Sequence, residues 1–254
     1  MRALAFAALV VGLALAGCGD DAGETTETET TTKTTTTSVE SARLSVYFLR
    51  DGQVWPVARE VGDVLFDDIA LDQLLAGPNA DEMQLGLETA LPEGLGADVT
   101  VEDGVATVEL VEPTDLTREA LAQIVYTETA LRLVESVVIG GETYSRSHFE
   151  EQTPSVLVES PLAFDDVTSP ITATGTANTF EATFHYTLTD TDGLIVDESF
   201  VTATSGTGTR GTFEFTTDEY TVPFDGIGAL IVFERSAQDG SEMNIVEIPL
   251  RMSR

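Results

Sequence analysis

Cationic side chains are scarce in this sequence. It has 12 lysines and arginines against 44 aspartates and glutamates, which gives a formal net charge of -32, and Lys33 is its only lysine. A field this acidic repels nucleic-acid phosphates and anionic lipid headgroups. The shortage of cations therefore argues against a nucleic-acid partner and against membrane binding through a basic surface.

The sequence also has a single cysteine, Cys18, and two histidines, His148 and His185. One cysteine excludes an internal disulfide, and because it lies near the N-terminus the folded part has no thiolate metal site. His148 follows Ser147 directly, and neighbours along the chain do not form a serine–histidine relay. His185 falls on the polar side of a predicted strand. We therefore expect both histidines to face solvent, and we predict neither a catalytic residue nor a cofactor.

The N-terminal segment has the pattern of an export signal. An apolar run over residues 3–16 follows Arg2, and it is too short to cross a hydrocarbon core of about 30 Å. The run ends in Leu15-Ala16-Gly17-Cys18, which resembles the lipobox of bacterial lipoproteins. The resemblance implies a signal peptide over residues 1–17 and a diacylglycerol on the thiol of Cys18.

Residues 18–40 consist mainly of Asp, Glu, Thr and Ser. Such a composition buries too little apolar surface to offset the entropy of ordering, so it predicts a flexible tether. Together with the lipid on Cys18, the tether predicts a protein that is anchored at the extracytoplasmic face of the cell membrane.

Helix and strand patterns mix over residues 41–150. Apolar strands flank a turn at Asp51-Gly52, and a second hairpin is predicted at Asp103-Gly104. A last strand covers residues 137–139. A first helix is predicted to open near Asp67 or Asp68 and to stop at Gly77-Pro78.

A longer helix is predicted to begin at Thr114, Asp115 or Thr117 and to carry Leu131 on its apolar stripe. These elements predict an α+β domain, in which two helices pack on one face of a mostly antiparallel sheet.

Five spaced segments of this part carry a family resemblance. They are VYFL at 46–49, VAREV at 57–61, LLAGP at 74–78, GVATV at 104–108 and AQIVYT at 122–127. Their order resembles the GerM-type sporulation and spore-germination domain over residues 43–145. The family usually has Leu where this chain has Glu128, which is a departure from its pattern.

Strand patterns alone fill residues 154–254, after a linker at 150–154. Apolar Phe180, Phe184 and Tyr186 alternate with polar neighbours, which indicates a strand with one buried face. We predict seven strands, over residues 156–159, 170–176, 180–189, 194–203, 211–216, 227–235 and 243–250. Seven short strands in about 100 residues favour an immunoglobulin-like sandwich.

This second part also carries a resemblance. The segments are SP at 160–161, SPI at 169–171, GTA at 175–177, FE at 180–181, GTF at 211–213 and SAQDGSE at 236–242. They resemble the immunoglobulin-like domain of bacterial spore-germination proteins over residues 154–251. Neither family brings a catalytic or metal-binding residue to this chain.

Acidic clusters are the remaining candidates for a site. Asp190 and Asp192 alternate before Gly193, as carboxylates do at the start of a calcium loop, but the distal glutamate of such a loop is missing. A hairpin turn explains the same residues. Asp165-Asp166 and the acidic residues of 239–242 are interpreted as loops.

These patterns predict a non-catalytic binding or assembly module of the cell envelope. The membrane is one expected partner, through the lipid, and an envelope protein or wall polymer is the other; self-association is a further possibility. Two alternatives stay open. One is a cell-wall hydrolase or hydrolase cofactor, and the other is a small-molecule-binding lipoprotein.

Overall fold

A β-hairpin opens the described part of the chain. The computed structural model describes residues 42–62 and 69–254. Strands β1 (Ala42–Arg50) and β2 (Gln53–Val61) pair antiparallel around Asp51 and Gly52, whose φ angles are 52° and 77°. Asp and Gly tolerate this left-handed conformation better than other residues. The predicted Asp51-Gly52 turn is therefore confirmed.

Three α-helices follow in the first domain: α1 (Ile69–Leu75), α2 (Ala80–Gln84) and α3 (Arg118–Glu128). The predicted start of the first helix, at Asp67 or Asp68, lies outside the described residues. Helix α2 was not predicted, although Asn79 and Glu82 form a capping box at its start.

Helix α3 takes one of its three candidate caps. The hydroxyl of Thr117 accepts a hydrogen bond from the backbone N–H of Ala120 at 3.2 Å. The helix ends at Glu128, so the placement of Leu131 on its stripe was wrong. Leu131 instead belongs to the turn after the helix, where its N–H bonds to the carbonyl of Glu128.

A four-stranded sheet completes this domain, in the order β3 (Ala97–Glu102), β4 (Val105–Leu110), β5 (Ser136–Ile139) and β6 (Glu142–Tyr144). Strands β4 and β5 are parallel because α3 connects them, and the other two pairings are antiparallel. Strand β6 was not predicted, since Gly140-Gly141 was interpreted as the end of the sheet. The chain instead turns at Gly140-Gly141 and continues as β6, which pairs with β5.

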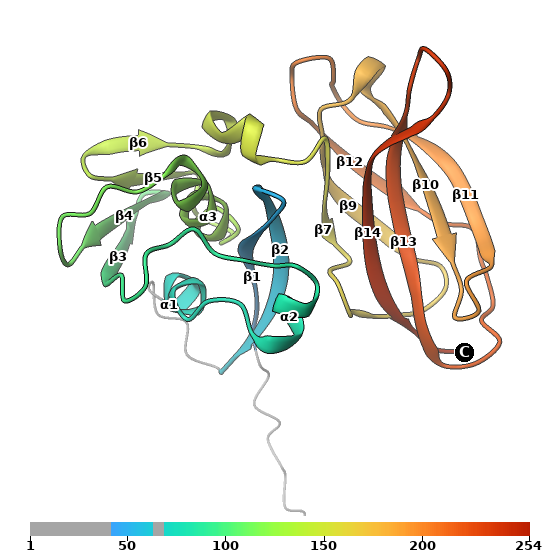
Figure 1. Cartoon of the computed structure of the whole chain (residues 1–254), viewed down its shortest axis with the longest axis horizontal. Coiled ribbons are helices and arrows are strands. Elements are labelled where there is room, and N and C mark those ends of the chain that lie inside the picture. The colour runs from blue at the N-terminus through green and yellow to red at the C-terminus, as the bar shows by residue number, and fades with distance from the viewer. Residues whose placement is uncertain (1–41, 63–68) are drawn as a thin grey trace, which may run out of the picture. The chain divides into compact units, whose positions relative to one another are not determined.

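Helix α3 is the centre of the first domain, and Figure 1 shows it between the β1–β2 hairpin and the β3–β6 sheet. Two of its polar side chains are fully buried and bind the backbone of Tyr47. Gln123 donates to the Tyr47 carbonyl at 3.2 Å, and Thr127 accepts from the Tyr47 N–H at 3.0 Å. Buried polar groups are tolerated only when paired, so these bonds dock the helix on β1 in one register.

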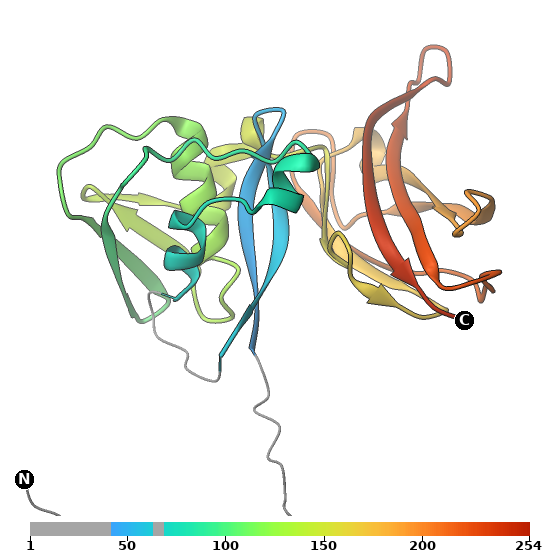
Figure 2. The same ribbon diagram turned by 60° about the horizontal axis from the view of Figure 1, so that its bottom comes forward.

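The second domain is a sandwich of two sheets. One sheet has the order β12 (Gly211–Thr216), β9 (Thr172–Ala177), β7 (Val156–Ser160). The other has the order β11 (Ile195–Thr202), β10 (Thr183–Thr189), β13 (Gly226–Arg235), β14 (Glu242–Met252), β8 (Asp166–Val167). Figure 2 shows β13 and β14 as long neighbouring strands. All seven predicted strands are present, and the short β8 is an addition.

The sandwich core contains the predicted alternation, with one correction. Phe184, Tyr186 and Leu188 are buried between the sheets, and the ring of Phe184 lies 4.8 Å from that of Phe213. Phe180 was expected on the same buried face but is 62% exposed. A 3-10 turn, η2 (Phe180–Ala182), precedes β10 and takes Phe180 out of the strand pattern.

Polar contacts join the two domains, which lie within one unit of the fold that spans Val39–Arg254. Arg146 opens the 3-10 helix η1 (Arg146–Gln152) and forms an ion pair of 2.6 Å with Glu159 of β7. The same carboxylate accepts a hydrogen bond from the Tyr47 hydroxyl at 2.6 Å. The guanidinium also packs over the rings of Tyr47 and Tyr126, at 5.4 and 4.7 Å. Arg146 therefore fastens the first domain to the first strand of the sandwich.

Candidate functional site

The predicted lipid-attachment residue, Cys18, lies outside the described residues. Within residues 42–62 and 69–254, no helix is both long enough and apolar enough to cross a membrane. The anchor therefore remains a prediction from the sequence.

His148 serves as a helix cap. It is exposed on η1, and its Nδ1 accepts hydrogen bonds from the backbone N–H and the hydroxyl of Ser145, each at 3.0 Å. Ser147 contacts Ser145 at 2.9 Å and does not contact the imidazole. In the described part of the chain no carboxylate orients this ring, as a catalytic relay would require. The bonds to Ser145 explain His148 as a structural residue.

His185 lies on the outer face of β10, as its alternation predicted, but it is half-buried. Its ring stacks on Phe233, with centroids 5.7 Å apart and planes at 19°. Burial and the nearby positive charge of Arg235 lower the pKa of His185. This shift favours the neutral imidazole, and the ring packs on the apolar surface of Phe233.

The Asp190 loop has the geometry of a turn. One carboxylate oxygen of Asp190 accepts backbone hydrogen bonds from Asp192 and Leu194, each at 2.9 Å, and Gly193 has a φ of 77°. These bonds close the turn through one of the two carboxylate oxygens of Asp190. Among the residues that the structure describes, no group of three or more His, Cys, Asp or Glu side chains is placed to hold a metal ion.

The two other acidic clusters also stabilise local structure. Asp165 accepts a hydrogen bond from the Leu162 N–H at 2.8 Å and forms an ion pair with Arg43. Asp239 accepts from the N–H and the hydroxyl of Ser241, at 3.1 and 2.8 Å, and these bonds lower its pKa. The loop prediction is confirmed for Asp165 and for residues 239–241, but it was wrong for Asp166, which begins β8, and for Glu242, which begins β14.

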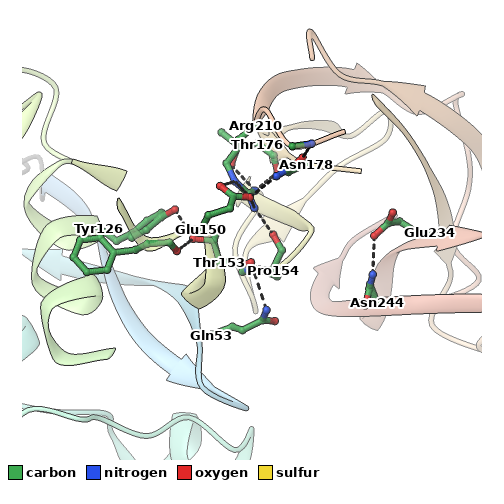
Figure 3. Close-up of polar contacts among 12 residues, drawn as sticks. Gln53, Tyr126, Glu150, Thr153, Pro154, Thr176, Asn178, Arg210, Glu234 and Asn244 are labelled. Carbon is green, nitrogen blue, oxygen red and sulfur yellow. Dashed lines mark hydrogen bonds and ion pairs between the residues drawn. The ribbon is translucent and has the colours of Figure 1, made fainter. Parts of the chain in front are cut away.

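A second contact at the junction of the two domains involves Glu150, which was predicted only as part of a linker. Figure 3 shows its carboxylate between Arg210 and Asn178, with contacts of 2.8 Å to each. Arg210 also donates to the carbonyl of Pro154 at 2.9 Å. Burial opposes the ionisation of Glu150, but the bonds from Arg210 and Asn178 outweigh it and lower the pKa of Glu150. This arrangement joins η1 to the sheet that contains β9 and β12.

A cleft of about 670 Å³ lies between the domains. Three of its lining residues are arginines: Arg43, Arg59 and Arg251. Arg43 pairs with Asp165, Arg59 pairs with Glu82, and Arg251 donates to the carbonyl of Phe164. The guanidinium groups of Arg43 and Arg59 are thus engaged by carboxylates, and that of Arg251 by a backbone carbonyl.

Large exposed apolar side chains are concentrated in the second domain. They are Met83, Val111, Leu133, Phe180, Leu194, Ile195, Phe200, Phe224, Ile227, Met243 and Ile245. Only the first three belong to the first domain. Exposed apolar residues that are scattered singly are ordinary on protein surfaces, so what matters is whether some of them lie side by side.

The fold defines an α+β domain followed by an immunoglobulin-like sandwich. Residues 45–142 match a family model described as sporulation and spore germination, and residues 155–241 match one described as the immunoglobulin-like domain of bacterial spore germination. The chain therefore carries these two domains in this order, as the residue patterns predicted. No curated protein matches the chain. The two families support a germination-related function, and neither is described as a family of enzymes.

Proposed function

We propose that this protein is a non-catalytic binding or assembly module, held at the outer face of the cell membrane by a lipid on Cys18. It acts in spore germination or sporulation by holding an envelope protein close to the membrane. The observation that carries the proposal is the concentration of large exposed apolar side chains on the sandwich.

The roles of the ionisable residues support this proposal. His148 caps a helix, Arg146 and Glu150 join the two domains, and Asp190 closes a turn. Each of these groups is explained by a structural contact, so none needs a catalytic role. Binding through a surface requires no reactive side chain, whereas turnover does.

The anchor is tested by Cys18→Ala in the cells that produce the protein. The unaltered chain should sediment with membranes and incorporate labelled fatty acid, because the thiol is the site of acylation. The variant should lose the label and leave the membrane fraction. Labelling that persists in Cys18→Ala would show that the lipid is attached elsewhere.

Turnover is tested by adding the purified chain to peptidoglycan and measuring released fragments. We expect no release above the buffer control. A release that disappears in His148→Ala or His185→Ala, but not in a surface control such as Leu133→Ser, would replace the binding module with a wall hydrolase.

A further inference from the structure

One face of the β11-β10-β13-β14 sheet points away from the sandwich core and carries a row of aromatic and apolar side chains. The strand registers place Phe200 opposite His185 and His185 opposite Phe233. On β14, Ile245 continues this row, because Ile231 pairs with Glu247 and alternation returns Ile245 to the same side. We call the row of Phe200, His185, Phe233 and Ile245 the apolar face.

The two ends of this row are open to solvent. Phe200 is 63% exposed and Ile245 is 56% exposed, whereas Phe233 between them is 3% exposed. Phe233 is covered by the His185 ring on one side and by the guanidinium of Arg235, 5.6 Å from its centroid, on another. The apolar face therefore has a packed aromatic residue at its centre and a solvent-exposed apolar side chain at each end.

Acidic residues lie beside the apolar face. The next row of the sheet runs Glu198, Thr187, Ile231, Glu247, so an exposed glutamate stands on each outer strand. Neither glutamate has an ion pair within the described residues.

The arginines near the apolar face have acidic neighbours. On the other side of the row Arg235 stands opposite Glu242, and near Ile245 a hollow is lined by Arg50 together with Asp51 and Glu247. The charges around the row therefore sum to a negative value.

The negative charge around the apolar face distinguishes between the molecules that could bind there. A second copy of the chain would bring another net charge of -32 to an acidic surface, and an anionic membrane would be repelled in the same way. A partner segment with positive side chains next to apolar ones could pair with the glutamates and cover the apolar face at the same time. A positive charge on the partner would also increase specificity, because an acidic competitor would place like charges opposite the glutamates at a cost in free energy.

We infer that the apolar face binds an extended or helical segment of a partner protein whose apolar side chains are flanked by Lys or Arg. The apolar side chains cover Phe200, Phe233 and Ile245, and the cations meet Glu198 and Glu247. This inference rests on the proposed binding function, and it adds the surface and the chemistry of the partner.

The test uses a photoreactive phenylalanine analogue, placed in the full chain at position 200 or 245 in the cells that produce it. Control positions are Thr107, on the outer face of the other domain, and Leu133, which is 80% exposed. Adducts are identified by mass spectrometry of the crosslinked peptide. We expect at least about fivefold more adduct from 200 and 245 than from the controls, joined to an apolar segment that contains Lys or Arg.

That segment is then synthesised and its affinity for the purified full chain is measured. Phe200→Ser should weaken binding at least about tenfold, as loss of an aromatic anchor does, whereas Leu133→Ser should leave it within about twofold. Glu198→Gln should lower the affinity mainly at low salt, because it removes a rim charge.

Four outcomes would overturn the inference: adducts to a second copy, adducts to lipid, adducts to an acidic or purely polar segment, and no adduct at 200 and 245. If adducts to a partner arise only at other positions, the binding function stands and the surface is wrong. If no position yields a partner, the binding function itself fails.

Discussion

The two domains differ most in the outer faces of their sheets. In the first domain the row across β3, β4, β5 and β6 runs Thr100, Thr107, Val138, Thr143. In the second, the corresponding row runs Phe200, His185, Phe233, Ile245. An antiparallel sheet with one solvated face normally has polar residues there. The row on the first sheet is mostly polar, as this rule expects, whereas the row on the second sheet contains two phenylalanines and an isoleucine; the proposed binding surface rests on this difference.

The largest expected effect separates the two sides of the second sheet. Phe184→Ala removes a fully buried ring and should lower the free energy of unfolding by about 3–5 kcal/mol. Phe200→Ala removes a ring that is 63% exposed on the outer face of the sheet and should change the free energy of unfolding by less than about 0.5 kcal/mol. Urea unfolding of both variants measures the difference. A large loss in Phe200→Ala would mean that the apolar face supports the fold.

Cutting the chain at the junction has an intermediate effect. Separate chains of residues 41–150 and 153–254 should each unfold cooperatively, because each has its own paired strands with buried apolar residues, although one apolar cluster runs through both domains. Each should also be less stable than in the whole chain by about 1–3 kcal/mol, since the Arg146–Glu159 and Glu150–Arg210 contacts are broken. Calorimetry of the three proteins provides the measurement. If one half unfolds without a transition, the domains depend on each other for folding.

Acid should weaken the same junction. The pKa of Glu150 is lowered from its ordinary value of 4.5, so its contribution to stability is present above that pH and is lost as the pH falls through the lowered value. Glu150→Gln removes the titrating group and should flatten the dependence of the free energy of unfolding on pH below 4.5. Glu151→Gln, one residue further along, is the matched control. Equal slopes in unaltered and Glu150→Gln protein would contradict the assignment.

The smallest effect is expected on the threonine row. Thr107→Val places one more apolar group on the first sheet and should change the free energy of unfolding by less than about 0.5 kcal/mol. It should also leave the binding of the crosslinked segment unchanged, because the segment meets the other domain. Chemical denaturation and fluorescence anisotropy measure the two quantities. Tighter binding by Thr107→Val would show that general hydrophobicity, and not the apolar face, attracts the partner.

Regular alternation made most of the fold predictable. Strand β10 alternates between buried and half-buried residues from Thr183 to Thr189. The two hairpins predicted at Asp51-Gly52 and Asp103-Gly104 are also confirmed. The errors lie where the chain leaves a regular element. Phe180 continues the alternation in sequence, but positive φ values at Glu181 and Ala182 separate it from β10, which begins at Thr183. Nothing in the local pattern specified that kink.

The apolar face was missed, although the sequence carries a signal for it. Residues 227–233 of β13 form a nearly continuous apolar run, which is typical of a strand covered on both sides. On β14, Ile245 and Val246 are adjacent and so point to opposite faces. The register that unites these residues with Phe200 depends on long-range pairing, which one strand alone does not reveal.

The contacts at the junction of the two domains could not be predicted from the sequence either. Glu150 and Arg210 are 60 residues apart and meet only because η1 turns the chain toward β9 and β12. Arg146 was not singled out, since a lone arginine in a polar segment has no distinctive pattern. Its role follows from the two tyrosine rings and the Glu159 carboxylate that the fold brings around it.

Radical footprinting tests the contrast between the two faces most directly. The full chain is labelled in the intact envelope of the cells that produce it and, separately, as purified protein. If the apolar face is covered by a partner, labelling of Phe200 and Ile245 should fall at least about fivefold in the envelope, while Leu133 and Val138 should keep their purified-protein labelling. Equal labelling of Phe200 in the two samples, or equal protection of Val138, would contradict the account.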